Sequence, residues 1–386
     1  MPKNPALLKS LSLALLACLL FPAVIFAAAP GVSDDKIVLG QTAATDGPAS
    51  ALGSGMQYGL QLWFDHVNST GGIHGRTIEL TTYNDGYEPV QALDNAKKLV
   101  EEDSVFALIG GVGTPTAKAV VPFVESAQVP FIGPFTGAGF LRDPDLNWVV
   151  NVRASYNQEM EALVAHLHDE LGYDRIGIFY QNDGYGQAGL SGLQAAMERR
   201  GLEISQEATY ERNTLAVKKG VLAFRKDPPQ AIVMEGAYKP RAEFIRVARR
   251  AKITDTLFCN ISFVGTRALF ADLGGDASDV LISQVMPDPR LKGLPFVSEY
   301  LDLLAKSGSN HEPDWISLEG FAVGKLFTEA LSKLGNDVTR SGFMEAIAAT
   351  GTFDLGGVVL EFSDNDSQGM NDVYMTAFKS GEIVDL

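Results

Sequence analysis

The stretch FYQNDGYGQAGL, residues 179–190, joins an apolar run to a segment with helical periodicity. Its spacing Gly184-x-Gly186-x-x-Gly189 follows the predicted strand and opens the predicted helix, which is the local setting of a dinucleotide-binding turn. The stretch therefore predicts a strand, a tight turn and a helix. It also raises the hypothesis of a nucleotide-dependent enzyme.

The same alternation of short apolar runs and helical segments continues from Lys36 almost to the end of the chain. The strand candidates are Ile37–Gly40, Ile78–Tyr83, Val105–Gly110, Pro130–Gly133, Arg175–Tyr180, Glu203–Tyr210, Ala231–Glu235, Leu257–Asn260, Val280–Val285, Val358–Phe362 and Met375–Lys379. The helix candidates are Ser54–Asn68, Val90–Glu101, Pro115–Ala127, Gln158–Glu170, Gln187–Arg200, Leu215–Arg225, Pro240–Ala251, Phe296–Ser307, Ser317–Leu334 and Ser341–Ala349. This repetition predicts an α/β fold of doubly wound, Rossmann-like lobes with parallel sheets. A length of 386 residues favours two lobes.

The N-terminus has the pattern of a secretory signal peptide. Two lysines precede an apolar run from Leu11 to Phe26, and alanines follow it. We expect residues 1–27 to be removed, with cleavage after Ala27 or Ala28. An alternative is a lipoprotein cleavage box ending at Cys18, but the apolar run continues past that residue. The pattern predicts an exported protein in a bacterial periplasm.

The net charge limits the partners that the chain can bind, and the cysteine content limits its disulfides. The formal net charge is −16, and loss of residues 1–27 would remove two lysines and no acid, which gives −18. Such a surface repels nucleic acid and anionic lipid. Only Cys18 and Cys259 occur, so the mature chain can form no internal disulfide. Cys259 lies in an apolar run, and we expect a buried, inert thiol there.

Polar and aromatic residues follow the predicted strands, where ligands bind in open α/β sheets. Thr114 is a candidate helix N-cap before Pro115, and Pro240 likewise occupies an expected first helical position. The strand-end loops of the first half contain Gly113-Thr114 and Phe135-Thr136-Gly137. Those of the second half contain Tyr185, Tyr238 and Ser262. Two tyrosines facing two hydroxyl-and-glycine loops are typical of a cleft that encloses a small molecule.

Catalytic and metal-binding motifs are missing from the sequence. There is no Gly-x-Ser-x-Gly elbow, no His-Glu-x-x-His motif and no Walker lysine. His166 and His168 are two residues apart on a predicted helix, so they face different directions and form a poor metal pair. We therefore expect no enzyme activity, no cofactor and no metal. The acid that should follow a dinucleotide turn by about 20 residues is offered only ambiguously, by Glu203 or Glu207.

Six segments in order resemble the periplasmic solute-binding proteins of the leucine/isoleucine/valine-binding type, with a type I periplasmic binding fold. They are TAATDGPASALGSGMQYGLQLWFDHVNSTGGIHGRTIEL (42–80), IGGVGTPTAKAVVPF, VPFIGPFTGA, FYQNDGYGQAGL, GAYKPRAEFIRVAR and FVGTRALFADLG. The resemblance covers about residues 35–386. It implies a monomeric receptor that captures a small organic solute and delivers it to an inner-membrane ABC permease.

The resemblance also implies two lobes joined by three crossover hinges. One lobe would take residues 36–152 plus 286–361, and the other residues 153–285 plus 362–386. The hinges would lie near residues 151–153, 285–287 and 361–363. Closure of the two lobes over the solute would then be the binding event.

The same resemblance assigns the ligand residues. A solute carboxylate would be held by Gly113 and Thr114, helped by the loop of Phe135, Thr136 and Gly137. Aromatic contacts would come from Tyr185 and Tyr238.

At two positions the chain departs from the family pattern. Ser262 stands where branched-chain amino-acid binders place an acid for the α-ammonium group, and Leu52 stands where a tyrosine is common. Glu319 is a candidate substitute for the missing acid, although a solvated helix residue is the expected reading.

These departures widen the ligand class to hydrophobic or branched-chain amino acids, amides and small carboxylates. Two other functions stay open. The same fold could sense a solute for a membrane signalling partner, and the remote alternative is the nucleotide-dependent enzyme.

Overall fold

A computed structural model describes residues 29–274, 276–363, 366–379 and 381–386. The predicted signal peptide and Cys18 lie outside these residues. Among the described helices, none combines the length and apolar character required to cross a membrane.

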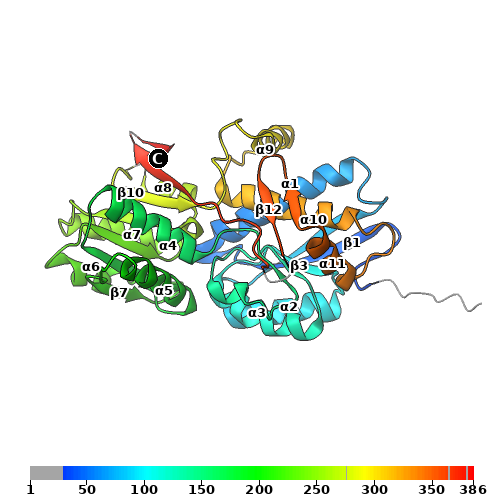
Figure 1. Cartoon of the computed structure of the whole chain (residues 1–386), viewed down its shortest axis with the longest axis horizontal. Helices are drawn as coiled ribbons and strands as arrows, with labels where there is room; N and C mark the ends of the chain where they lie inside the picture. The colour runs from blue at the N-terminus through cyan, green and yellow to red at the C-terminus, as the bar shows by residue number, and fades with distance from the viewer. Residues whose placement is uncertain (1–28, 275, 364–365, 380) are drawn as a thin grey trace, which may run out of the picture.

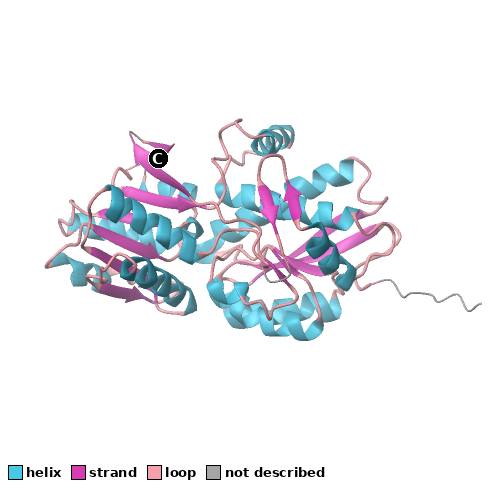
Figure 2. Ribbon diagram, in the orientation of Figure 1, coloured by secondary structure: helices cyan, strands magenta, loops and turns pink. Residues whose placement is uncertain are grey.

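The strands form two large sheets and one small hairpin, and the sheets belong to lobes that lie side by side (Figures 1 and 2). The five-stranded sheet has the order β2-β1-β3-β4-β5 and is parallel throughout. The seven-stranded sheet has the order β14-β13-β10-β9-β8-β6-β7, in which β13 runs antiparallel to both of its neighbours. Below, the five-stranded lobe and the seven-stranded lobe are named after these sheets. The strands are β1 (Lys36–Ala43), β2 (Thr77–Asn84), β3 (Ala107–Ile109), β4 (Phe131–Ile132), β5 (Val149–Val150), β6 (Ile176–Gln181), β7 (Glu207–Tyr210), β8 (Ala231–Glu235), β9 (Leu257–Asn260), β10 (Val280–Gln284), β11 (Thr352–Asp354), β12 (Val359–Glu361), β13 (Tyr374–Lys379) and β14 (Glu382–Asp385).

Helices cover both faces of each sheet, which makes the strands apolar along most of their length. In the five-stranded lobe, α2 and α3 cover one face, and α1 packs along α10 on the other (Figure 1). In the seven-stranded lobe, α4 packs against α5, and α7 contacts both α6 and α8. The helices are α1 (Ser50–Ser69), α2 (Pro89–Lys97), α3 (Thr114–Ala127), α4 (Tyr156–Val164), α5 (Gly184–Glu198), α6 (Lys218–Arg225), α7 (Tyr238–Arg250), α8 (Thr266–Leu273), α9 (Pro295–Lys306), α10 (Trp315–Ser332) and α11 (Arg340–Thr350).

The chain passes three times between the sheets: after β5, after β10 and after β12. The first and third passages are hydrogen-bonded to each other. The Asn151 amide donates to the Ser367 carbonyl over 2.7 Å, and the Gly369 amide donates to the Asn151 carbonyl over 2.8 Å. The predicted α/β fold of two doubly wound lobes joined by three crossovers is therefore confirmed.

Several predicted boundaries are wrong for identifiable reasons. Pro240 is the third residue of α7, which begins at Tyr238, and α8 was missed because its eight residues are too few for a clear period. The run 358–362 does contain a strand, β12, but it pairs with β11 in a separate two-stranded sheet rather than with either large sheet. Cys259 is fully buried in the seven-stranded sheet, as expected, and burial raises the pKa of its thiol.

Candidate functional site

The carboxyl ends of the two sheets approach each other through aromatic side chains. Phe263 of the seven-stranded lobe is at the centre of this ring group. Its ring centroid lies 5.5 Å from that of Phe135 and 6.1 Å from that of Tyr87, both in the five-stranded lobe. On its own side Phe263 lies 4.6 Å from Tyr185, which lies 5.5 Å from Tyr156. All five rings are buried, so the lobes meet over a continuous aromatic surface.

Three hydroxyl groups gather beside this ring group. The Thr114 and Thr136 hydroxyls are 2.7 Å apart, and both residues are buried. The buried Tyr156 hydroxyl has no hydrogen-bond partner, and the side chains of Thr136 and Thr114 both act to lower its pKa. Burial raises the pKa of Tyr156 to about 12, so its hydroxyl keeps its proton and can donate.

Thr114 does not cap α3, contrary to the sequence prediction. It is the first residue of the helix, and the N-cap is Gly113, whose φ is +106°. A Cβ at Gly113 would lie 2.2 Å from the Tyr87 ring. The backbone therefore needs glycine both for this φ and for the ring that packs on it. As a result the Thr114 hydroxyl is directed to Thr136 rather than to its own helix.

Tyr185 is fixed at both ends. Its hydroxyl accepts a hydrogen bond of 2.9 Å from Nη2 of Arg241, and its amide donates to the Asp183 side chain, which caps α5. The glycines of the opening motif permit this placement. A Cβ at Gly186 would lie 2.0 Å from the Gln181 carbonyl oxygen, and none of the three glycines has a positive φ. The motif therefore serves close packing of α5 on the strand ends.

Two predicted site residues lie apart from the ring group. Tyr238 begins α7, and its hydroxyl is 3.4 Å from both the Ser50 hydroxyl and the Ala51 amide at the start of α1. Leu52 is buried in α1, where its Cδ2 lies 2.9 Å from the position that a Cβ on Gly265 would take. Both residues therefore bridge the lobes, next to the strand ends rather than between the rings.

Ser262 has a carboxylate beside it. Its amide and hydroxyl donate to Glu159 of α4 over 2.8 and 3.0 Å, and Ser283 donates to the same carboxylate over 2.7 Å. Glu159 is fully buried, and this desolvation raises its pKa. Three donors occupy most of its acceptor positions. The sequence did not single out Glu159, because no local motif marks a residue 103 positions away from its partner.

The expectation of a solvated Glu319 is wrong. Only 2% of its side chain is exposed, and it forms a two-point ion pair with Arg153, with both N–O distances 2.8 Å. The Arg153 guanidinium also lies 4.1 Å from the centroid of Phe135. Arg153 thus joins the first passage between the lobes to α10 and to the ring group.

A second buried acid lies at the end of β8. Glu235 is fully buried, neither of its oxygens has a hydrogen-bond partner, and its nearest cation is Nη2 of Arg241 at 3.9 Å. Desolvation is the main reason that its pKa is raised to about 8. Glu235 is therefore largely protonated at neutral pH and is a weak partner for a cationic ligand.

Charged residues also join the lobes at one edge of the site. Arg212 of the seven-stranded lobe lies 2.9 Å from Glu88 of the five-stranded lobe and 2.9 Å from Asp183. The Asn213 side chain donates to the Gly86 carbonyl over 3.0 Å and to Glu88 over 2.7 Å. These contacts hold the lobes against each other beside Tyr87.

The chain is similar to known binding proteins over almost its whole length. The profile of a family described as periplasmic binding protein matches residues 36–382. The chain belongs to this family. A crystal structure of a possible leucine/isoleucine/valine-binding protein from Rhodopirellula baltica SH 1 is 34% identical, with a TM-score of 0.87 over 93% of this chain and 98% of that one. A substrate-binding periplasmic protein from Ralstonia solanacearum is 27% identical, with a TM-score of 0.85 over 91% of this chain and all of that one. Leu/Ile/Val-binding protein homolog 7 of Brucella abortus is 22% identical over 80% of this chain and 79% of that protein.

This periplasmic binding protein is of the Leu/Ile/Val-binding type, and its family consists of solute-binding proteins rather than enzymes. The nucleotide-dependent enzyme is therefore not supported by this chain's relatives, and the glycine spacing has the packing role described above. In the part of the chain that the structure describes, no group of three or more histidine, cysteine or acidic residues is arranged to hold a metal ion.

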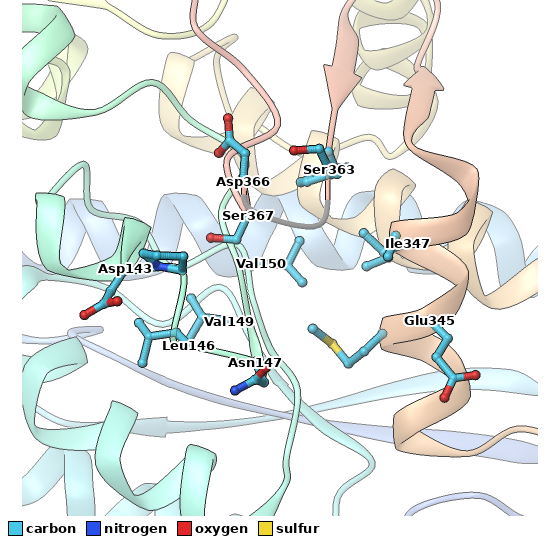
Figure 3. Close-up of a pocket in the computed structure, with 14 residues that line it drawn as sticks. Asp143, Leu146, Asn147, Val149, Val150, Glu345, Ile347, Ser363, Asp366 and Ser367 are labelled. Carbon is cyan, nitrogen blue, oxygen red and sulfur yellow. The ribbon is translucent and has the colours of Figure 1, made fainter.

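A cavity of about 300 Å³ lies elsewhere in this periplasmic binding protein (Figure 3). Val149 and Val150 of β5 form one wall, and Ile347 of α11 faces them, with Ser363 and Ser367 of the third passage above. None of the predicted site residues lines it. The cavity is therefore separate from the ring group and its hydroxyls.

The structure thus brings together part of the predicted set. Thr114, Thr136, Phe135 and Tyr185 lie with the rings and hydroxyls, and Gly113 and Gly137 hold partner rings. A Cβ at Gly137 would lie 2.6 Å from Tyr156. Sequence reasoning missed Tyr87 and Tyr156. Each directly follows a structural signal, Tyr87 the turn Asp85-Gly86 and Tyr156 the helix cap Ser155, and such a signal could have marked them.

Proposed function

We propose that this periplasmic binding protein captures a small organic solute between its lobes and delivers it to an inner-membrane ABC permease. The observation that carries the proposal is the group of Thr114, Thr136 and Tyr156 hydroxyls beside rings from both lobes. These hydroxyls and the first amides of α3 suit a carboxylate or carbonyl oxygen. The rings suit an apolar body.

The proposed lobes are residues 36–152 plus 286–361 and residues 153–285 plus 362–386, in support of which each large sheet falls within one of them. Contacts such as Phe135 with Phe263 exist only when the lobes are together. A solute that touches both lobes therefore favours the closed state by its differential affinity. Export to the periplasm through a cleaved signal peptide, and a monomeric state, are part of the same proposal.

The ligand class follows from the charges around the rings. The Glu159 carboxylate beside Ser262 is occupied by three donors, and Glu235 is largely protonated at neutral pH. Neither is a strong partner for an α-ammonium group. Within the class of hydrophobic amino acids, amides and small carboxylates, this favours solutes with one acid or carbonyl group and little positive charge.

Isothermal titration calorimetry of protein freed of ligand by unfolding and refolding tests the proposal. The panel contains branched-chain amino acids, short aliphatic and aromatic acids, and their amides. We expect at least one solute to bind with a 1:1 stoichiometry, and Thr114→Val to weaken it at least tenfold. Ser191→Ala, on the exposed face of α5, is the matched control. A folded protein that binds none of these solutes contradicts the proposal.

A further inference from the structure

Two turns from opposite lobes meet at one edge of the ring group. One turn, residues 85–88, follows β2 in the five-stranded lobe, and the other, residues 211–214, follows β7 in the seven-stranded lobe. Both neighbours of Tyr87 in the first turn are bound by side chains of the second. Tyr87 itself is buried between these two points of contact. The turns therefore join the lobes through one buried ring and the polar groups on either side of it.

Each turn is shaped by bonds within its own lobe. The Asp85 carboxylate accepts hydrogen bonds from the Tyr87 amide over 2.8 Å and from the Thr42 hydroxyl over 3.0 Å. In the other turn the Thr214 amide and hydroxyl donate to the Glu211 carbonyl over 3.2 and 2.7 Å. None of these bonds crosses between the lobes. We therefore expect both turns to keep their shape when the lobes separate.

Both turns hold a residue other than glycine in the left-handed region of the backbone. The φ angle is +63° at Tyr87 and +59° at Asn213. Asparagine tolerates this conformation, but a bulky ring adopts it rarely. Strained backbone of this kind is typical of clamps and switches, where the surrounding structure fixes it. These two residues are also ones that reach across the boundary between the lobes.

The Tyr87 ring contributes apolar contact to the closed arrangement. Behind the ring, its Cε2 lies 2.2 Å from the position that a Cβ on Gly113 would take, so the ring is held firmly on its own lobe. In front of it, the centroid of the Phe263 ring is 6.1 Å away in the other lobe. Separating the lobes exposes the Tyr87 ring to water. Closing them buries that ring again, which favours the closed state.

The Tyr87 hydroxyl has the opposite effect. It is enclosed by protein atoms and has no hydrogen-bond partner among the described residues, and desolvation is the main reason that its pKa is raised well above the ordinary value. Gln181, which acts to lower that pKa, already donates to Asp183 over 2.7 Å and accepts from Tyr210 over 3.2 Å. Burying a hydroxyl without a partner costs free energy. The hydroxyl therefore opposes closure.

We propose that residues 85–88 and 211–214 form a closure latch, in which the Tyr87 ring favours the closed state, the Tyr87 hydroxyl opposes it, and neither depends on the identity of the solute. The inference goes beyond the proposed function, although it rests on closure as the binding event. A solute that binds the closed form pays for the fraction of protein that is open. A change in the latch should therefore scale the affinity of every solute by one common factor.

Two variants of Tyr87 have opposite expected effects. Tyr87→Ala removes the ring and should weaken every solute that binds in the calorimetric panel about tenfold or more. Tyr87→Phe keeps the ring but removes the unpaired hydroxyl, so it should tighten every solute about fivefold. Each factor should agree between solutes to within about twofold. Tyr83→Phe, which removes a hydroxyl of the same lobe that is bonded to Asp103 outside the latch, is the matched control and should leave affinity unchanged.

Asn213→Gly tests the other turn without straining it. Glycine accepts the left-handed backbone, and the substitution removes only the side-chain bonds to Gly86 and Glu88. This variant should weaken all solutes by a common factor, and it serves in place of Tyr87→Ala if that protein does not fold. Small-angle X-ray scattering of the solute-free proteins reads the same equilibrium. Tyr87→Phe should have a smaller radius of gyration than Asn213→Gly.

Weaker binding of any solute to Tyr87→Phe would assign the hydroxyl to the solute and overturn the latch. Factors that differ between solutes by more than about threefold would overturn it as well, since a shift in the closed fraction acts on all of them alike. If solutes bind and none of the latch variants changes their affinity, the inference fails and the proposed function stands. If no solute binds, the proposed function fails, and equal radii of gyration for Tyr87→Phe and Asn213→Gly would overturn the latch too.

Discussion

Arg241 and Tyr185 are joined by a buried hydrogen bond of 2.9 Å between the guanidinium Nη2 and the phenolic oxygen, across 56 positions of sequence. The other Nη of Arg241 donates to Asn260 over 3.0 Å, so the guanidinium links the ends of two helices and a strand. This bond fixes the ring that borders both Phe263 and Tyr156. The orientation of the ring group therefore depends on the Arg241 guanidinium, which holds the Tyr185 ring in place.

Removing only the Tyr185 hydroxyl should destabilise the folded protein without leaving a cavity in the ring group. Tyr185→Phe leaves a buried donor of Arg241 unpaired, which we expect to cost about 1–3 kcal/mol of folding free energy. Tyr185→Ala should cost more, about 3–5 kcal/mol, because the ring is fully buried. Urea unfolding of both variants checks that Tyr185→Ala loses more folding free energy than Tyr185→Phe. Equal stability of wild type and Tyr185→Ala would show that the ring is not packed as described.

The Arg153–Glu319 ion pair should behave as a buried unit. Glu319→Leu leaves the Arg153 charge in the interior without its partner and should lower the unfolding free energy by about 3–5 kcal/mol. The double variant Arg153→Met, Glu319→Leu should recover part of that loss, since neither charge is then buried alone. Chemical unfolding of the four members of this cycle measures the coupling. Additive losses would mean that the two side chains do not interact.

The raised pKa of Glu235 predicts that the free energy of unfolding falls as pH rises. Its pKa in the folded state, about 8, is above the ordinary value of 4.5, so between these pH values the folded state binds more protons than the unfolded state. The contribution of Glu235 to the free energy of unfolding is fully present below about pH 4.5 and is lost as pH rises through about 8. Asp85, whose buried carboxyl has a pKa raised to about 6, contributes with the same sign over a narrower range. Thermal unfolding from pH 4.5 to 9 should show a shallower decline for Glu235→Gln than for wild type, and an identical slope would refute the assignment.

Gly113 should not tolerate a side chain. Gly113→Ala places a Cβ against the Tyr87 ring at a φ of +106°, and backbone strain of this kind costs about 1–3 kcal/mol before the clash is counted. Gly139→Ala is the matched control, because a Cβ there meets nothing within 4 Å and its φ is not positive. Thermal shift assays should show a large loss for the first variant and a small change for the second. Similar melting temperatures would place Tyr87 elsewhere.

The Glu88–Arg212 contact should add a salt-sensitive component to solute affinity. Half of the Glu88 side chain is exposed, so Glu88→Gln should weaken solute binding only modestly, up to about fivefold. The loss should shrink at high ionic strength. Glu79→Gln, which breaks a surface pair with Lys36 inside the five-stranded lobe, should have no effect on binding. A Glu88→Gln effect independent of salt would argue against an ionic contact between the lobes.

Local patterns predicted the fold well, because alternating apolar runs and helical segments fix the order of strands and helices. They also placed Thr114, Phe135 and Tyr185 at strand ends. They could not predict that Glu319 is buried, because its partner is 166 residues away on another element. They misread Thr114 as a cap for a similar reason, since its hydroxyl partner is Thr136 on the next strand-end loop.

A crystal structure of the protein with the tightest solute from the calorimetric panel tests the central claim most directly. The account predicts one solute molecule between the lobes, with an oxygen within hydrogen-bonding distance of the Thr114 and Tyr156 hydroxyls and its body against Phe263. A solute bound instead in the cavity beside Val150 and Ile347, or on the outer surface of either lobe, would contradict it.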